Sequence, residues 1–211
     1  MAALSYIGEP SAWKYALRTA LCLVLLLFLR PWRYYSAPRW RDIPWGIGGG
    51  ILALGIWLLP EISWSSNGPF LQEMYLRFGI MPLGRLPAAT ETSIYDPRIA
   101  GWFMALTRLA GSAFVIAIIE EFFWRGFLYR WLIERRFTRL SPATWDVEAF
   151  LIMVLLFGLE HNRWLAGMAA GAVYGALMIY TRSIWSACFA HIVTNLLLGI
   201  YVLNAGAYVF W

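Results

Sequence analysis

The sequence predicts an all-α protein, a polytopic membrane bundle of about six transmembrane helices around a central polar cavity. Hydrophobic residues make up 61% of the 211 residues and charged residues only 14%, against roughly 25% charged in a soluble domain. Too few charged side chains remain to cover a water-facing surface, and the mean hydropathy of +0.60 agrees. A disulfide scaffold is excluded because Cys22 and Cys188 both lie in apolar stretches.

Six apolar stretches are the predicted transmembrane helices. They cover residues 13–29, 44–59, 99–131, 147–161, 164–180 and 184–203. The first stretch is expected to be retained rather than cleaved as a signal peptide. Arg30 and Pro31 follow it at the place where a signal peptide has small residues.

Residues 61–98, between the second and third stretches, are polar, broken by prolines and too charged to span a membrane. A short helix in the membrane interface is predicted at residues 67–81, because Phe70, Met74 and Phe78 recur at i, i+4 and i+8. The chain is therefore predicted to have two parts. Residues 1–98 hold the N-terminal transmembrane helices and this connecting segment, and residues 99–211 hold a transmembrane core.

The formal net charge of +5 does not indicate nucleic-acid binding, because the arginines cluster in short loops beside apolar stretches. Such clusters set membrane orientation and bind anionic lipid headgroups, so membrane lipids are the expected partners. If the six spans alternate in direction, the three arginine-rich loops all lie on one side, which is predicted to be cytoplasmic. These loops contain Arg30, Arg33, Arg39, Arg41, Arg130, Arg135, Arg136, Arg139 and Arg182.

Polar side chains inside the spans are the candidate functional residues, since burial in hydrocarbon is costly unless they pair or face a cavity. At about 1.5 Å of rise per residue, Glu120 lies roughly 15 Å and His161 roughly 22 Å from the arginine-rich edge. His191 and Asn195 lie roughly 14 and 20 Å from the same edge. Three helices thus place polar groups in one band near mid-membrane, and we expect them to meet around one cavity.

Spacing within each helix indicates how these groups are arranged. Glu121 and Arg125 are related as i and i+4, so they share a helix face and can form an ion pair. Glu120 is turned by about 100° from Glu121 and is free to face the cavity. Two further pairs share a face by the same rule: Phe157 with His161, and His191 with Asn195.

Each pattern also has a purely structural explanation. A buried Glu121–Arg125 pair is more often structural than catalytic, and the pair His191 and Asn195 can link helices by hydrogen bonds. Arg108 has no assigned role. Glycines spaced four residues apart predict close helix packing: Gly167, Gly171 and Gly175.

Three motifs, taken in order along the chain, resemble the CAAX-protease and bacteriocin-processing family of intramembrane endopeptidases, which includes the type II CAAX prenyl proteases. The resemblance covers about half of the chain and uses its two histidines. Residues 160–211 resemble a narrower bacterial subfamily, the CAAX-protease-related proteins found with exosortase and PEP-CTERM sorting systems. The motifs are Glu120-Glu121-x-x-x-Arg125, Phe157-x-x-x-His161 and His191-x-x-x-Asn195.

The resemblance implies an endopeptidase of a cell inner membrane, with a cavity open to the cytoplasm and a membrane-associated peptide or protein as substrate. It implies that Glu120 and His161 activate water without a cofactor, while His191 and Asn195 form the oxyanion hole. Proteins of an exosortase system are further partners that it implies. The residues that it implies in supporting roles are Glu121, Arg125 and Phe157.

Two alternatives stay open. Zinc binding through Glu120, His161 and His191 is one, although the H-E-x-x-H motif of zinc proteases is absent. The other is a non-enzymatic membrane scaffold or transporter-like protein whose buried Glu and His residues bind a ligand or a proton. The protease interpretation requires Glu120 and His161 to line the same cavity.

Overall fold

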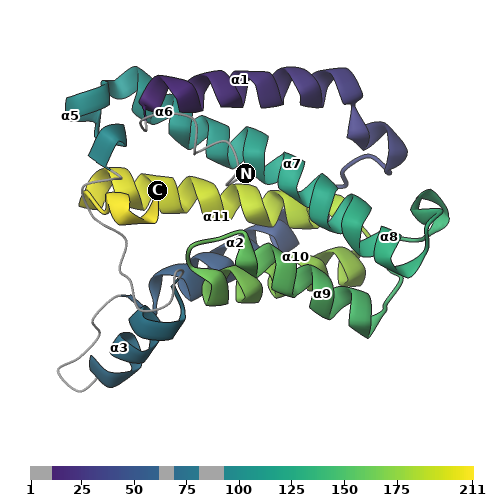
Figure 1. Ribbon diagram of the computed structural model, residues 1–211. Helices are drawn as coiled ribbons and strands as arrows, with labels where there is room; N and C mark the ends of the chain where they lie inside the picture. Colours follow the sequence, from purple (N-terminus) through teal and green to yellow (C-terminus); the bar gives the residue numbers. More distant parts are fainter. Residues whose placement is uncertain (1–10, 62–68, 81–92) are drawn as a thin grey trace.

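The computed structural model describes residues 11–61, 69–80 and 93–211, which form helices and no strand. This arrangement, shown in Figure 1, confirms the predicted all-α helical bundle. A helix also forms in the segment predicted to lie in the membrane interface, as α3 (Pro69–Phe78); its place in the interface stays a prediction. Residues 67, 68 and 81 of that prediction lie outside the described residues.

Four helical segments are long and apolar enough to cross a membrane. They are α1 (Ala12–Leu29) with the short helix η2 (Pro31–Tyr34), the continuous helix Trp102–Ile133, α10 (Trp164–Thr181) and α11 (Ile184–Ala205). Two more of the predicted spans are shorter apolar helices, α2 (Asp42–Leu58) and α9 (Val147–Leu159). The chain is therefore an integral membrane protein, and its outer surface agrees with this, because Phe28 on α1 is 80% exposed.

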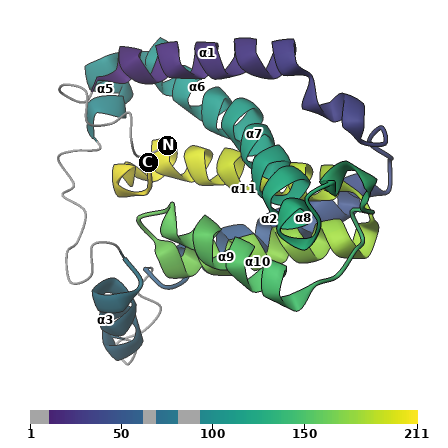
Figure 2. The ribbon, with the colours of Figure 1, turned by 45° about the vertical axis from the view of Figure 1, so that its right-hand side comes forward.

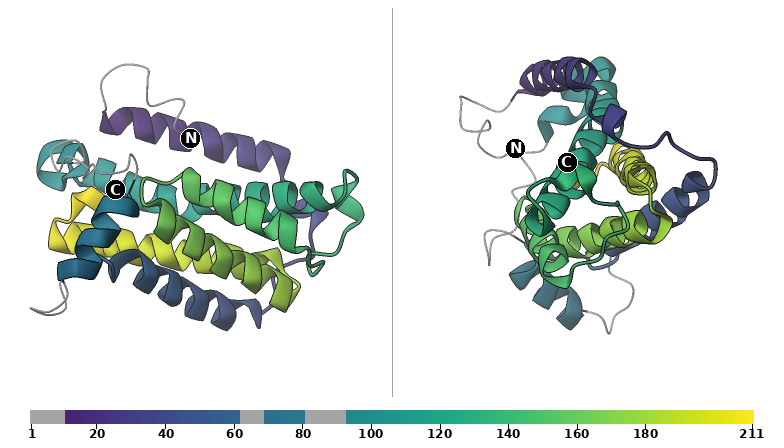
Figure 3. Two further views of the ribbon diagram at one scale, coloured as in Figure 1. Left: turned by 60° about the horizontal axis from the view of Figure 1, so that its bottom comes forward. Right: turned by 90° about the vertical axis from the view of Figure 1, so that its right-hand side faces the viewer.

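The helices lie in layers around α11. Helix α1 packs on the outside against α6 (Trp102–Ala110), while α2 and α10 pack on the other side of α11, and α9 packs on α10. Figure 2 and the end-on view in Figure 3 show α11 between these two layers. Sequence-distant segments therefore meet along α11, which carries both His191 and Asn195.

Glycines allow α2, α9, α10 and α11 to approach one another closely. A Cβ on Gly171 would lie 2.8 Å from Cδ1 of Phe157 on α9, and one on Gly175 would lie 2.7 Å from Cε2 of Phe150. A Cβ on Gly50 of α2 would lie 2.6 Å from the carbonyl oxygen of Ala190 on α11. Such contacts confirm that the glycine repeat of α10 serves close helix packing.

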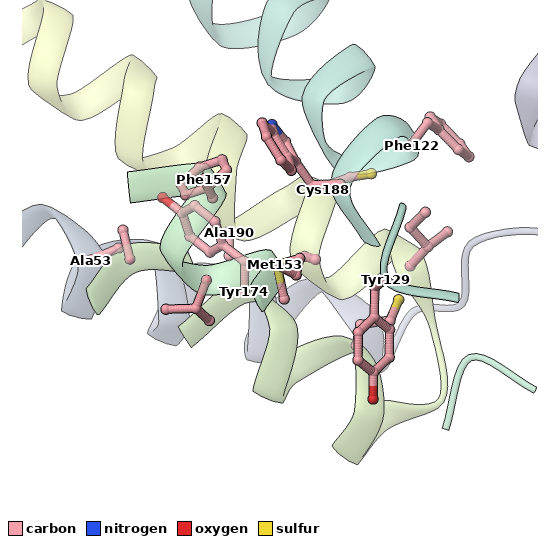
Figure 4. Close-up of a cluster of buried hydrophobic side chains, with 14 of the residues drawn as sticks. Ala53, Phe122, Tyr129, Met153, Phe157, Tyr174, Cys188 and Ala190 are labelled. Carbon is pink, nitrogen blue, oxygen red and sulfur yellow. The ribbon is translucent and has the colours of Figure 1, made fainter. Parts of the chain in front are cut away.

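The apolar core lies where α2, α9, α10 and α11 meet the long helix. Phe157 belongs to this core, and only 1% of its surface is exposed. It also lines the polar cavity that holds the candidate functional residues. Figure 4 shows the core and labels Ala53, Phe122, Tyr129, Met153, Phe157, Tyr174, Cys188 and Ala190.

The bundle has two ends with different chemistry. We call the end with loops 30–41, 134–146 and 182–183 the arginine end. The buried carboxylate of Asp42 holds this end together by accepting three hydrogen bonds. The donors are Arg39 (Nη2 to Oδ1, 2.9 Å), Ser183 (Oγ to Oδ2, 2.9 Å) and Ser186 (Oγ to Oδ1, 3.3 Å).

We call the opposite end, with residues 57–61, 160–163 and 206–211, the carboxyl end. There Arg163 forms an ion pair with Glu61 and donates from Nη1 to the carbonyl oxygen of Val209 at 3.0 Å. These bonds tie the last residues of the chain to the ends of α2 and α9. Figure 3 shows the two ends at opposite sides of its left-hand view.

Candidate active site

The long helix that carries both glutamates is not a regular α-helix. Two π-helical stretches, η4 (Gly111–Ile116) and η5 (Phe122–Leu128), flank the short α-helical segment α7 (Ala117–Glu121). Such stretches are rare and frequently occur at functional sites. In the first of them the carbonyl oxygen of Ser112 accepts a hydrogen bond from Nδ2 of Asn195 on α11, at 3.1 Å.

One cavity of about 200 Å³ brings together the four residues predicted from the sequence. Glu120 comes from α7, His161 from the turn after α9, and His191 and Asn195 from α11. Glu120 and His161 therefore line the same cavity, as the protease interpretation requires. Its other lining residues are Trp57, Arg108, Ser112, Phe157, Ala170, Tyr174, Thr194, Leu198, Phe210 and Trp211.

The two adjacent glutamates point in different directions. The side chain of Glu120 is 14% exposed and its Oε2 lies 3.7 Å from Nε2 of His191. The side chain of Glu121 is fully buried, and its Oε1 accepts from Nη1 of Arg125 at 3.0 Å, which confirms the predicted ion pair. Arg125 is fully buried too, and its Nη2 donates to the carbonyl oxygen of Gly171 at 2.9 Å.

Glu121 also has a contact that the sequence did not predict. The same Oε1 atom lies 2.8 Å from Nδ1 of His191. Because this carboxylate also accepts from Arg125, it acts as an acceptor, and His191 carries a proton on Nδ1. Glu121 thus joins the ion pair on the long helix to the cavity histidine on α11. Seventy positions separate the two residues, so no local pattern indicated the contact.

The ring of His191 is held by its neighbours. It stacks on Tyr174 of α10, with ring centroids 4.8 Å apart and an interplanar angle of 22°. The hydroxyl of Tyr174 donates to Oγ1 of Thr194 at 2.8 Å. With Nδ1 fixed by Glu121, the remaining ring nitrogen, Nε2, lies toward Glu120. Tyr174 was not predicted as a site residue, since nothing in the sequence of an apolar, glycine-rich helix distinguishes this tyrosine from packing residues.

The position of the proton on His161 follows from its hydrogen bond. Its Nδ1 lies 2.7 Å from the carbonyl oxygen of Phe157, and a carbonyl oxygen only accepts, so Nδ1 carries the proton. In the neutral ring Nε2 then has a free lone pair. The ring lies against Trp57 and Phe157, with centroid distances of 5.5 and 4.7 Å.

Phe157 connects several parts of the site. The guanidinium carbon of Arg125 lies 4.2 Å from its ring centroid, and the His191 ring centroid lies 6.0 Å away. A Cβ on Gly171 would lie 2.8 Å from Cδ1 of Phe157, which is too close, and 3.4 Å from Nη2 of Arg125. The small residue on α10 therefore leaves room for the aromatic ring and the cation that support the site.

Metal binding has its own structural requirement. Among the residues that the structure describes, no three His, Cys, Asp or Glu side chains are placed to hold one metal ion. A catalytic zinc site needs at least three protein ligands. The residues of the zinc alternative, Glu120, His161 and His191, therefore do not form such a ligand set here.

The cavity extends from mid-bundle toward the carboxyl end. Trp57, His161 and Trp211 line it there, whereas the buried side chains of Glu121 and Arg125 are not among its lining residues. The sequence predicted both that the arginine loops are cytoplasmic and that the cavity opens to the cytoplasm. Depth along a helix does not determine toward which end a cavity opens, so the membrane side that each end faces stays a prediction.

The fold and the cavity define a class, an integral membrane protein whose helices enclose a polar site. Residues 101–197 match the family model of the type II CAAX prenyl endopeptidase, Rce1-like, so this part of the chain is similar to that family. The match contains all three motifs and confirms the resemblance to CAAX proteases. It supports an intramembrane protease function in general. No curated protein and no solved structure matches the chain.

Proposed function

We propose that the protein is an intramembrane endopeptidase in which Glu120 and His161 activate water and His191 and Asn195 hold the oxyanion. The observation that carries the proposal is that these four side chains, from three separate parts of the chain, line one cavity. All four lie within residues 101–197, the part of the chain that matches the family model of the type II CAAX prenyl endopeptidase. The substrate is a peptide or protein tail tethered to the membrane.

In the first step, the carboxylate of Glu120 accepts a proton from water while the water oxygen attacks the scissile carbonyl carbon. The free Nε2 lone pair of His161 accepts the second hydrogen bond of that water and orients it. When the carbon–nitrogen bond breaks, the proton on Glu120 passes to the leaving amine nitrogen. Glu120 is suited to this exchange because its carboxylate lines the cavity, with its Oε2 3.7 Å from Nε2 of His191.

His191 and Asn195 supply donors to the carbonyl oxygen as it becomes negative. Asn195 has two amide hydrogens; one goes to Ser112, and the other is available for the oxyanion. His191 donates from Nε2 when its ring carries both protons, while its Nδ1 donates to the Glu121 carboxylate. Each oxyanion donor contributes about 2.7–4 kcal/mol in comparable enzymes.

The orientation that we propose keeps the arginine loops in the cytoplasm, because short arginine-rich loops are the strongest orientation signal in the chain. The cavity then opens to the opposite side of the inner membrane and receives its substrate there. Membrane lipids surround the helices in either orientation. Proteins of an exosortase sorting system are the partners that the narrower resemblance of residues 160–211 suggests.

Cleavage of a quenched-fluorescent peptide library by the detergent-purified protein tests the proposal. We expect turnover that disappears in Glu120→Gln, falls about 100- to 1,000-fold in Asn195→Ala, and survives a strong chelator. Loss of turnover under chelation would favour the zinc alternative. Full activity of Glu120→Gln would remove Glu120 from the mechanism, and absence of any cleavage would favour the scaffold or proton-binding alternative.

A further inference from the structure

A cation without an acidic partner lies in the same cavity as the proposed catalytic residues. Arg108, in α6, lines the cavity together with Glu120 and Asn195. Within residues 11–61, 69–80 and 93–211, no carboxylate forms an ion pair with it, and its Nε has no hydrogen-bond partner. A charge within a membrane helix is costly unless it is paired or serves a function.

Aromatic rings hold the Arg108 guanidinium without neutralising it. Its central carbon lies 4.1 Å from the ring centroid of Tyr95, 4.6 Å from that of Tyr15 and 5.6 Å from that of Trp211. The guanidinium of Arg18 also lies near Tyr15, at 5.2 Å. Two cations thus share one ring, and cation–π contacts leave their positive charge in place.

The buried arginines elsewhere in the bundle differ from Arg108. Arg125 has Glu121, Arg163 has Glu61, and Arg130 donates to the carbonyl oxygen of Leu140. Arg108 instead lines the cavity with only aromatic rings against its guanidinium among the described residues, and its Nε has no hydrogen-bond partner. A guanidinium is matched best by a carboxylate, which it binds through two parallel hydrogen bonds.

We propose that Arg108 binds a carboxylate of the peptide substrate and thereby sets where the peptide lies relative to Glu120. This inference rests on the proposed endopeptidase function. Twelve residues separate Arg108 from Glu120, or about 18 Å along the helix at about 1.5 Å per residue. An extended peptide covers about 3.3 Å per residue, so the recognised carboxylate lies within about five residues of the scissile bond.

Two kinds of carboxylate fit this position, the C-terminal carboxylate of the substrate and an acidic side chain. Matched peptides distinguish them: one pair differs only in a free or amidated C-terminus, and the other only in Glu or Gln at each acidic position. We expect the wild-type protein to prefer the carboxylate member of one pair at least tenfold in kcat/KM. The preference arises mainly in KM, because Arg108 contacts substrate away from the reacting atoms.

Arg108→Gln should reduce this preference to about one while its rate on the neutral peptide stays near that of wild type. Arg108→Lys, which keeps a point charge without the planar fork, should retain part of the preference. Arg98→Gln is the matched control at the same end of the bundle, since Arg98 has a side chain 86% exposed and is paired with Asp96 outside the cavity. It should keep the wild-type preference.

A binding experiment separates failure of this inference from failure of the proposed function. The dissociation constant of each labelled peptide is measured on Glu120→Gln with and without Arg108→Gln. A carboxylate preference that disappears with Arg108 supports the subsite even if no peptide is cleaved. Equal losses on charged and neutral peptides, or no preference in wild type, would overturn the inference. It would also be overturned if phosphatidylglycerol, rather than the peptide carboxylate, depends on Arg108 for binding.

Discussion

Neutralising Glu121 tests the central electrostatic arrangement of the site. Glu121→Gln keeps the size of the side chain but removes the charge that faces both Arg125 and His191. The Arg125 guanidinium is fully buried, and without the Glu121 carboxylate its hydrogen-bond acceptor among the described residues is the carbonyl oxygen of Gly171. Its Nε already lacks a partner. The substitution therefore leaves a buried cation without a counter-charge.

Removing one partner of a buried ion pair costs about 3–5 kcal/mol. For a chain of this length, 1 kcal/mol corresponds to roughly 2–4 °C in the unfolding temperature, so Glu121→Gln should lower it by about 6–20 °C. Glu120→Gln provides a matched control one residue away. Its carboxylate is partly exposed and lies 3.7 Å from Nε2 of His191, so the change should cost about 1 kcal/mol or less.

Thermal unfolding in one detergent, followed by tryptophan fluorescence, measures both variants, and the peptide assay measures their activity. We expect Glu120→Gln to lose activity with little change in the unfolding temperature, and Glu121→Gln to lose both. Similar unfolding temperatures for Glu121→Gln and wild type would refute the reasoning, because the buried cation would then not need its counter-charge. A larger loss of stability in Glu120→Gln than in Glu121→Gln would refute it as well.

Two further predictions concern packing and orientation. Gly171→Ala should destabilise the protein by about 1–3 kcal/mol and reduce activity, because its Cβ would lie 2.8 Å from Cδ1 of Phe157 and displace that ring. Gly48→Ala, with no atom within 4 Å of its Cβ, should leave stability and activity unchanged in the same unfolding and cleavage assays. In a protein without Cys22 and Cys188, an impermeant maleimide added to intact spheroplasts should label Asn204→Cys at the carboxyl end but not Ser141→Cys at the arginine end. The reverse labelling would place the cavity opening in the cytoplasm.

Much of the fold was predictable because apolar runs of this length have few structural solutions. Residues 164–180 and 184–203 were predicted as helices and form α10 and α11 with boundaries one or two residues away. The shorter α2 and α9 were predicted from the same signal. The π-helical stretches were not predicted. Both form where the long helix packs against helices distant in sequence, η4 against α1 and α11 and η5 against α9 and α11, and local propensity does not encode such packing.

The gathering of Glu120, His161, His191 and Asn195 in one cavity was expected from their depth along separate helices. The contact between Glu121 and His191 was not, because depth and helix face describe each helix alone. Arg108 carried a signal in the sequence, a charge in an apolar helix, but its aromatic neighbours come from α1, η3 (Ser93–Tyr95) and the last described residue. No spacing rule joins such distant positions.

The sequence by itself determined that the chain is a helical membrane protein. It also determined which polar side chains are candidate functional residues, since burying an ionisable group in hydrocarbon is costly unless the group is paired or functional. It also determined the Glu121–Arg125 pair, because i and i+4 positions meet on any helix. Only the tertiary structure decided that Glu121 reaches His191, that the cavity extends toward the carboxyl end, and that Arg108 faces into it. These features depend on how helices distant in sequence pack together, and that packing is set by the joint fit of their surfaces rather than by any one segment.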